Sequence, residues 1–259
     1  MPPGALSRCI LCGVLAVGCS DPDTYTDPAP SRVPAPPETT TNYALSFDGV
    51  DDYVTSATSG FPFSEFSQTL AAWIKITDNQ GQHAILTMRR AEESGTMFGV
   101  ENGQLVSYNI FGMRLFVESD ETLAPDEWHH VAFSQEAIDD DPASYTQRLY
   151  VDGELVATGD LPPQNRTPIV GYIGAFDSER SLFEGEIDEL RVYARLLDDQ
   201  EVLQLASAEE PSRESLVGYW TFNDPPEERV AYDRSSFDNH ATLGDGALEY
   251  MPRRVVSNR

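Results

Sequence analysis

The stretch that most constrains the fold of this chain is residues 183–193, which read FEGEIDELRVY. Polar and apolar side chains alternate along it, and this period of two predicts a long β-strand. One face would carry Ile187, Glu189, Arg191 and Tyr193, and the other Glu186, Asp188, Leu190 and Val192. Asp188 is thus expected in line with core residues. Because a buried carboxylate without a partner is costly, Asp188 requires an arginine, backbone N–H donors or a metal cation.

Strand-like runs fill most of the chain after residue 42, separated by Gly, Asn and Asp. We expect strands at residues 43–47, 69–76, 84–88, 97–100, 105–110, 113–117, 128–133, 148–151, 169–173 and 216–222. Asn102-Gly103 and Asp152-Gly153 suit the positive φ angles of hairpin turns. The pattern predicts antiparallel strands spaced as in a two-sheet sandwich.

A single short helix is expected after the long strand. Asp198 is followed three residues later by Glu201, which is the pattern of a capping box. Val202, Leu203 and Leu205 then provide a short apolar face. The fold class predicted is therefore all-β with one short helix.

The charge of the chain excludes one class of partner. Acidic residues number 43 and basic residues 17 among the 259, for a net charge of −26. Nucleic acid is not expected as a partner, since its phosphates require a basic face. All three cysteines, Cys9, Cys12 and Cys19, precede the strand-rich region, so we expect no disulfide within the folded domain.

The first residues have the layout of a secretory signal. Arg8 precedes an apolar run, and residues 15–19 read LAVGC. This resembles a bacterial lipobox, which implies that residues 1–19 are a lipoprotein signal peptide and that Cys19 is lipidated. An ordinary signal peptide cut elsewhere is the alternative. A lipid on Cys19 implies membrane attachment at the bacterial cell envelope, in the outer membrane.

Residues 20–42 are rich in Pro and Thr and contain few large apolar side chains. Such a segment cannot bury enough surface to fold, and proline favours an extended conformation. We expect a disordered tether between the anchor and the domain.

Several motifs together resemble the concanavalin A-like jelly rolls of the laminin G and pentraxin kind, specifically bacterial LamG-like domains. The matching segments are residues 44–54 (ALSFDGVDDYV), 70–74 (LAAWI), 127–132 (EWHHVA), 149–153 (LYVDG) and 185–193 (GEIDELRVY). The resemblance implies a two-sheet antiparallel jelly-roll sandwich over residues 43–252. It is specific for the fold and weak for the ligand, because such folds host lectins, adhesins, receptors and glycosidases.

The order of one motif departs from this family. A segment like residues 216–224 (LVGYWTFND), continuing to residues 241–243, usually precedes the Phe-Asp-Gly element, whereas here it follows the helix. Our hypothesis is that the domain is permuted, with residues 216–252 supplying a strand in place of the usual first one.

Calcium is the cofactor that the resemblance implies. The late strand of these folds carries an aspartate that binds structural calcium, and its position corresponds to Asp188. The remaining ligands would be mostly backbone carbonyls, either in the region of Asp48 and Gly49 or in that of Asn223 and Asp224, since hard oxygen donors suit the ion. Pairing of Asp188 with arginine or backbone N–H groups is the alternative.

Catalysis is not expected. Related β-glucanases carry a Glu-x-Asp-x-Glu or Glu-x-Asp-x-x-Glu strand, and Glu186 and Asp188 begin that motif. Leu190 and Arg191 occupy the two positions where the second glutamate would fall, so the second catalytic acid is missing.

A non-catalytic binding domain is therefore the expected function, in a lipid-anchored surface protein that binds a glycan or an extracellular protein. The candidate ligand-binding residues are Tyr108, Asn109 and Phe111, whose aromatic and amide groups could stack on and hydrogen-bond a sugar. The alternatives are a glycosidase of the same fold and a purely structural adhesion component.

Replacing Cys19 with alanine tests the anchor. Cells fed a palmitate analogue should label the wild-type protein, and the C19A variant should lose that label because the acceptor thiol is gone. Cys12→Ala is the matched control and should retain it. Unchanged labelling of C19A would contradict the lipobox.

Overall fold

The computed structural model describes residues 37–57, 67–90, 94–110, 113–138, 141–161 and 170–259. The signal segment, Cys19, most of the expected tether and Phe111 lie outside these residues. Among the described residues, none of the helices combines the length and the apolar composition needed to cross a membrane.

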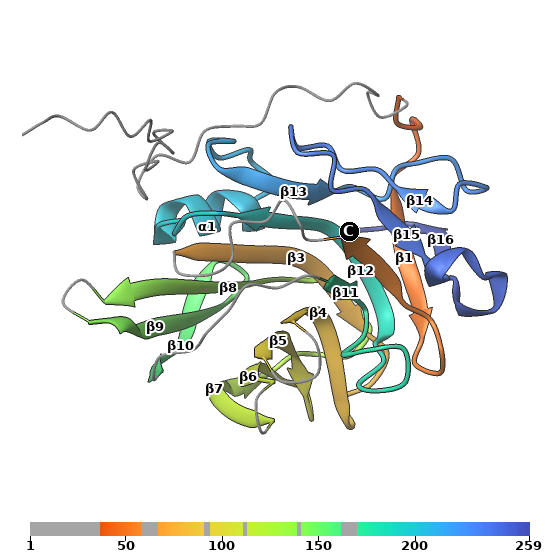
Figure 1. The fold of residues 1–259 in the computed structure, drawn as a ribbon. Coiled ribbons are helices and arrows are strands. Elements are labelled where there is room, and N and C mark those ends of the chain that lie inside the picture. The colour runs from red at the N-terminus through yellow and green to blue at the C-terminus, as the bar shows by residue number, and fades with distance from the viewer. Residues whose placement is uncertain (1–36, 58–66, 91–93, 111–112, 139–140, 162–169) are drawn as a thin grey trace, which may run out of the picture.

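Two antiparallel sheets form the domain (Figure 1). The first sheet has the strand order β10-β9-β8-β3-β12-β1-β16, with β13 also paired to β12. Its strands are β1 (Tyr43–Asp48), β3 (Gln68–Ile76), β8 (His129–Ile138), β9 (Asp141–Val151), β10 (Glu154–Leu161), β12 (Glu184–Tyr193), β13 (Leu216–Trp220) and β16 (Arg253–Val256). This sheet contains β12, the long strand predicted at residues 183–193.

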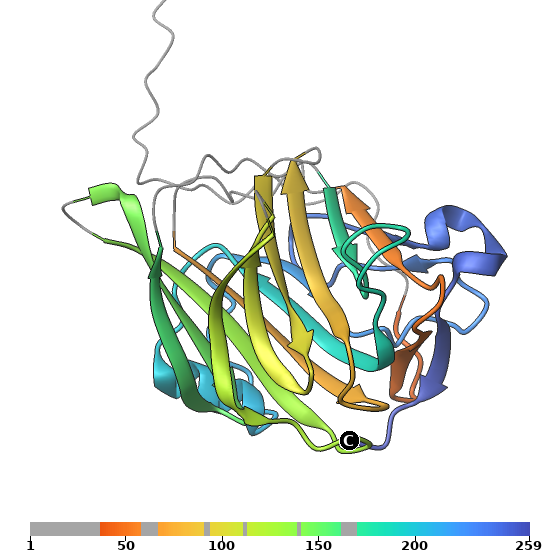
Figure 2. The same ribbon diagram turned by 90° about the horizontal axis from the view of Figure 1, so that it is seen from below.

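The second sheet has the order β14-β15-β2-β11-β4-β5-β6-β7 and lies in front of the first in Figure 2. Its strands are β2 (Val54–Ala57), β4 (Gln82–Arg90), β5 (Ser94–Glu101), β6 (Gln104–Asn109), β7 (Arg114–Thr122), β11 (Val170–Ile173), β14 (Val230–Ala231) and β15 (Ala241–Leu243). Two short 3-10 helices, η1 (Gly244–Gly246) and η2 (Leu248–Tyr250), follow β15. The predicted all-β, two-sheet antiparallel jelly-roll sandwich is confirmed.

The core lies between the two sheets. The first sheet contributes Ile74, Ile187 and Trp220, and the second contributes Phe98 and Leu105, all almost fully buried. Along each strand the alternate side chains face away from this core, as the pleat requires. Each sheet therefore also has an outer face, and both outer faces carry polar side chains.

The predicted helix is confirmed as α1 (Asp199–Ala206). The Asp198 side chain accepts a hydrogen bond from the Glu201 amide, and the Glu201 side chain accepts one from the Asp198 amide. Val202 and Leu205 pack with other apolar residues into a second cluster, which includes Tyr150 and Tyr193 of the first sheet. The helix covers the side of that sheet that faces away from the second sheet (Figure 1).

Strand β12 is present, but the predicted face of Asp188 is wrong. A β-bulge interrupts the pairing of β12 with β3 between Asp188 and Arg191, and Glu189 there has a φ of 53°. The extra residue shifts the alternation by one, so Leu190 and Val192 face the core whereas Asp188 faces outward beside Trp73. The carboxylate is buried on the outer face and not in the core.

The segment that follows α1 is built into both sheets. β13 pairs with residues 190–193 of β12, while β1 pairs with residues 184–187 along the same edge. β16, which lies beyond residue 252, pairs with the other edge of β1. Residues just before β1 also contact this segment, since the Thr39 amide donates to the Asn223 carbonyl.

Deleting residues 212–259 is expected to unfold the domain. The deletion removes Val217, Trp220 and Phe222 from the core, and burying one large aromatic side chain alone contributes about 3–5 kcal/mol. Circular dichroism during heating measures this, and the expected result is the loss of the cooperative transition. An unchanged melting temperature in the truncated protein would contradict the described pairing of β13 with β12.

Candidate functional site

A row of side chains crosses the outer face of the second sheet. Val54, Ile173 and Leu243 face the core, so their strand neighbours Thr55, Tyr172 and Thr242 point outward. Strand register places Tyr172 directly opposite Thr55, and Thr55 opposite Thr242. These half-buried residues come from three segments that are far apart in the sequence, and the sheet brings them together.

Three tyrosine rings pack in a row on this face. The ring centroids of Tyr53 and Tyr172 lie 6.1 Å apart. Those of Tyr53 and Tyr250 lie 6.0 Å apart in a stacked arrangement, with 25° between the ring planes. Tyr53 is buried between its neighbours, whereas Tyr250 is 36% exposed. We call Tyr53, Thr55, Tyr172, Asp245 and Tyr250 the tyrosine face.

Charged groups flank these rings. Asp245 accepts hydrogen bonds from the Thr55 hydroxyl at 2.6 Å and from the Tyr53 hydroxyl at 3.3 Å. Burial and the neighbouring Asp245 raise the pKa of Tyr53 to about 12, so its hydroxyl stays protonated. On the other side the Arg89 guanidinium lies 5.9 Å from the centre of the Tyr172 ring. Half-exposed rings with a carboxylate and a guanidinium beside them can stack on and hydrogen-bond a polyhydroxylated ligand.

The predicted ligand residues Tyr108 and Asn109 are not brought together. Tyr108 faces outward and continues the same cross-strand row through Met97 and Thr87. Its ring is only 9% exposed because it packs in a cluster that contains Phe176, and its hydroxyl donates to Glu101. Asn109 follows Tyr108 in the strand and therefore points to the opposite face. Phe111, the third candidate, lies outside the described residues.

Sequence reasoning missed the tyrosine face itself. Tyr172 lies in a strand that the pattern predicted, but Asp245 and Tyr250 lie in the two 3-10 helices, in a segment without strand alternation. The Tyr53 amide donates to the Tyr250 carbonyl, and this contact fixes one ring against the other. Nothing in the local sequence indicates such a long-range contact.

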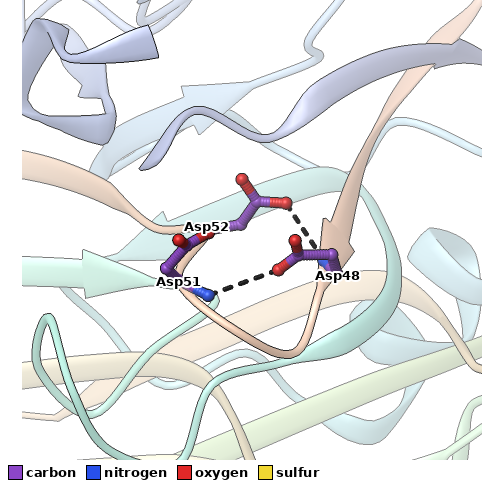
Figure 3. A group of neighbouring side chains, drawn as sticks. All are labelled: Asp48, Asp51 and Asp52. Carbon is purple, nitrogen blue, oxygen red and sulfur yellow. Dashed lines mark hydrogen bonds between the residues drawn. The ribbon is translucent and has the colours of Figure 1, made fainter. Parts of the chain in front are cut away.

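The turn after β1 holds three aspartates close together (Figure 3). One carboxylate oxygen from each of Asp48, Asp51 and Asp52 lies within 4.8 Å of the other two. The Asp48 side chain accepts hydrogen bonds from the amides of Val50 and Asp51. The Asp52 side chain accepts one from the Asp48 amide, and Figure 3 draws this bond and the one from Asp51. Hard oxygen donors in this arrangement fit calcium, and calcium at Asp48 and Gly49 stays a prediction.

Asp188 does not join this acidic turn. Asp48 is paired with Glu184, and Asp188 lies four residues further along β12, which is about 13 Å of strand. The partner of Asp188 is Arg259, whose Nε lies 2.7 Å from Asp188 Oδ2. The arginine pairing that the sequence left open is therefore what the structure shows, and the acidic turn and Asp188 are separate.

The carboxyl groups on β12 are not presented to a substrate. Glu186 pairs with Lys75 at 2.6 Å. Asp188 is 0% and Glu189 9% exposed, and Arg259 contacts both of them. A retaining glycosidase requires two accessible carboxyl groups on one face, and this strand does not provide them.

Replacing Asp52 with asparagine is expected to stabilise the protein at neutral pH. Burial and the nearby Asp48 raise the pKa of Asp52 from 3.8 to about 6. The folded protein thus binds this proton more tightly than the unfolded chain, so stability falls as the pH rises from about 4 through 6. Urea unfolding with a calcium chelator present should show, for D52N, a gain of about 1 kcal/mol at pH 7.5, after allowance for solvent screening, and none at pH 4.

The exposed Asp120 provides the matched control, because D120N changes the net charge equally. It should change the free energy of unfolding by much less than D52N at pH 7.5. Equal effects of the two substitutions would mean that general charge repulsion, and not the environment of Asp52, controls stability.

Comparison with known proteins agrees with the fold. Residues 48–203 match the laminin G-type family model described as the concanavalin A-like lectin/glucanases superfamily. C-reactive proteins 1.1 and 3.3 of Limulus polyphemus are each 22% identical over 160 residues, which cover 58% of this chain. The match spans 65% of the length of these relatives.

A crystal structure from Bacteroides ovatus ATCC 8483, provisionally assigned as a carbohydrate binding protein, has a similar fold. The TM-score is 0.63 at 17% identity, and the match covers 86% of this chain and 62% of that one. At this identity the likeness concerns the fold alone. The family model, by contrast, matches more than half of the chain. The fold agrees with it, since it is a jelly roll of the laminin G and pentraxin kind. The chain therefore belongs to the concanavalin A-like lectin/glucanases superfamily.

Proposed function

We propose that the domain is a non-catalytic module that binds carbohydrate through the tyrosine face. The observation that supports this proposal is the row of packed rings from Tyr172 through the buried Tyr53 to Tyr250, in which the two outer rings are partly exposed. Asp245 lies at this surface, and Arg89 flanks it. The family includes both lectins and glucanases, so the fold alone does not choose between binding and hydrolysis.

The chemistry of the tyrosine face matches a sugar ring. The C–H groups on one side of a pyranose pack against an aromatic ring, and Tyr172 and Tyr250 offer partly exposed rings for this contact. The hydroxyl groups at the rim of the sugar require donors and acceptors, which Arg89 and Asp245 supply. Because Asp245 and the ring of Tyr53 are already held by hydrogen bonds and stacking, little ordering is needed on binding.

Binding is favoured over hydrolysis by the position of the acidic groups. The adjacent carboxylates of Asp188 and Glu189 are buried against Arg259 on the other sheet. The acidic turn at Asp48, Asp51 and Asp52 would hold calcium in this proposal, and the ion would neutralise three crowded carboxylates. Neither group has the arrangement of an acid and a nucleophile on either side of a bound sugar.

The proposed setting is the surface of a bacterial cell. A lipid on Cys19 would attach the chain to the outer membrane, and residues 20–42 would act as a spacer. The described end of that segment is attached to the domain, since Glu38 contacts the Thr221 hydroxyl and lies 3.4 Å from Arg234. The glycan, or the glycan of an extracellular protein, would then be bound at a distance from the membrane.

A glycan array probed with the whole chain tests the proposal. The expected result is binding to a defined set of glycans, weakened about fivefold by Y172A or by Y250A, since an aromatic contact contributes roughly 1 kcal/mol. The control is Leu155→Ala on the first sheet, because Leu155 is similarly exposed but far from the face. Binding that survives both tyrosine substitutions, or that L155A also removes, would refute the tyrosine face as the site.

A further inference from the structure

A second built site lies on the outer face of the first sheet, and one of the chain's own arginines fills it. The Arg259 guanidinium donates from Nε to Asp188 Oδ2 at 2.7 Å. Its Nη2 lies 3.2 Å from Glu189 Oε1. The centre of the guanidinium is 5.7 Å from the centre of the Trp73 ring. Two carboxylates along one edge and an aromatic ring against the plane therefore surround this group.

The bulge in β12 creates the carboxylate pair. Without the extra residue, Asp188 and Glu189 would point to opposite faces of the sheet. The positive φ of Glu189 and the shifted register instead let both carboxylates reach the same guanidinium. A non-glycine residue in this backbone region is strained, so the local conformation is maintained at a cost.

The site places two carboxylates, those of Asp188 and Glu189, where solvent hardly reaches them. Asp188 is fully buried, and its Oδ1 accepts no hydrogen bond from the residues that the structure describes. Burial raises the pKa of Asp188 to about 6, although Arg259 acts to lower it. A cation is therefore required here, because an uncompensated buried carboxylate costs several kcal/mol.

The neighbouring basic side chains, His130 and Arg191, do not supply the cation that Asp188 needs. His130 packs edge-on against Trp73, and burial lowers its pKa to about 3, so it is neutral. Arg191 contacts Glu189 at 2.8 Å, but it also binds Glu210 at 2.7 Å and the Tyr219 hydroxyl. Asp188 has only Arg259 as a salt-bridge partner among the described residues.

We propose that Trp73, Asp188 and Glu189 form a guanidinium-binding site, with Arg259 as its resident ligand, and that the site takes other guanidinium-bearing ligands when Arg259 leaves it. A planar guanidinium can donate from two nitrogens along one edge while its plane stacks on an indole ring. A lysine-like ammonium has neither the planar fork nor the stacking surface. The ligand class is thus arginine side chains and small guanidinium compounds.

The geometry also indicates how Arg259 could leave. Among the described residues, the strand that leads to it, β16, pairs with β1 alone, and the buried Arg254 side chain anchors this strand through the carbonyls of Phe222 and Glu228. Next to Arg259, the Asn258 side chain accepts a hydrogen bond from the half-buried Trp128 indole. The Ser257 amide still donates to the Asn42 carbonyl, whereas residues 258 and 259 are held through their side chains. A competing arginine side chain would replace one buried ion pair with an equivalent one.

Chemical rescue of the R259A variant of the full chain tests the site. The melting temperature of R259A should be below that of the wild type, and millimolar methylguanidinium should raise it by several degrees. The same compound should leave the wild type unchanged, because Arg259 occupies the site. Methylammonium should have no effect on either protein. If R259A is unfolded alone, recovery of its circular dichroism spectrum on titration with methylguanidinium is the measurement.

Two controls separate a specific site from general effects. Asp188→Asn in the R259A background should abolish the rescue, since it removes the charge that the guanidinium pairs with. Arg148→Ala removes an arginine that pairs with Glu136 on the same sheet, and methylguanidinium should not stabilise it. Absence of rescue in R259A, equal rescue by methylammonium, or rescue of R148A would each overturn the proposal.

Discussion

The pairing of strand β12 with three neighbours is the interaction on which the rest of the domain depends. One edge of β12 is bonded to β3 over almost its whole length, and the other edge is shared between β1 and β13. The first and third strands of the domain and the segment after the helix therefore meet on one strand. The side chains of Ile187, Leu190 and Val192 then join the core shared with the second sheet.

Because of the single extra residue at Glu189, the apolar and the charged side chains of β12 lie on opposite faces of the sheet. Apolar side chains on either side of the bulge remain in the core, while Asp188, Glu189 and Arg191 are placed together on the outer face. Burying these charges is tolerable because they pair with one another and with Arg259. The two outer faces of the sandwich thereby differ: one buries an ion-pair network, and the other presents partly exposed tyrosine rings.

Local patterns in the sequence predicted the features that depend on neighbouring residues. The strands, the helix with its Asp198 and Glu201 cap, and the need of Asp188 for a partner were all predictable in this way. The face of Asp188 was not, because only tertiary pairing shows that Glu189 adopts a positive φ. Strand β10 was missed, and it carries its own bulge between Leu155 and Ala157.

The candidate site was less predictable than the fold because it depends on register between distant strands. Tyr108 was chosen for its residue type, and it does lie on the same outer face as Tyr172. Its burial beside Phe176, however, comes from the segment between β11 and β12, which no local pattern connects to β6. Tyr250 joins Tyr53 through a contact that spans most of the domain's length.

The position of β1 between β12 and β16 has a mechanical consequence. Hydrogen bonds hold this strand along both edges. Two more attach the residues just before it, from the Thr39 amide to the Asn223 carbonyl and from the Ser257 amide to the Asn42 carbonyl. A pull transmitted through residues 37–42 along the strand axis would load these bonds together in shear, and not one after another as in peeling. A domain held in this way resists extension from its N-terminal side, where a tether under flow or adhesion would exert its force.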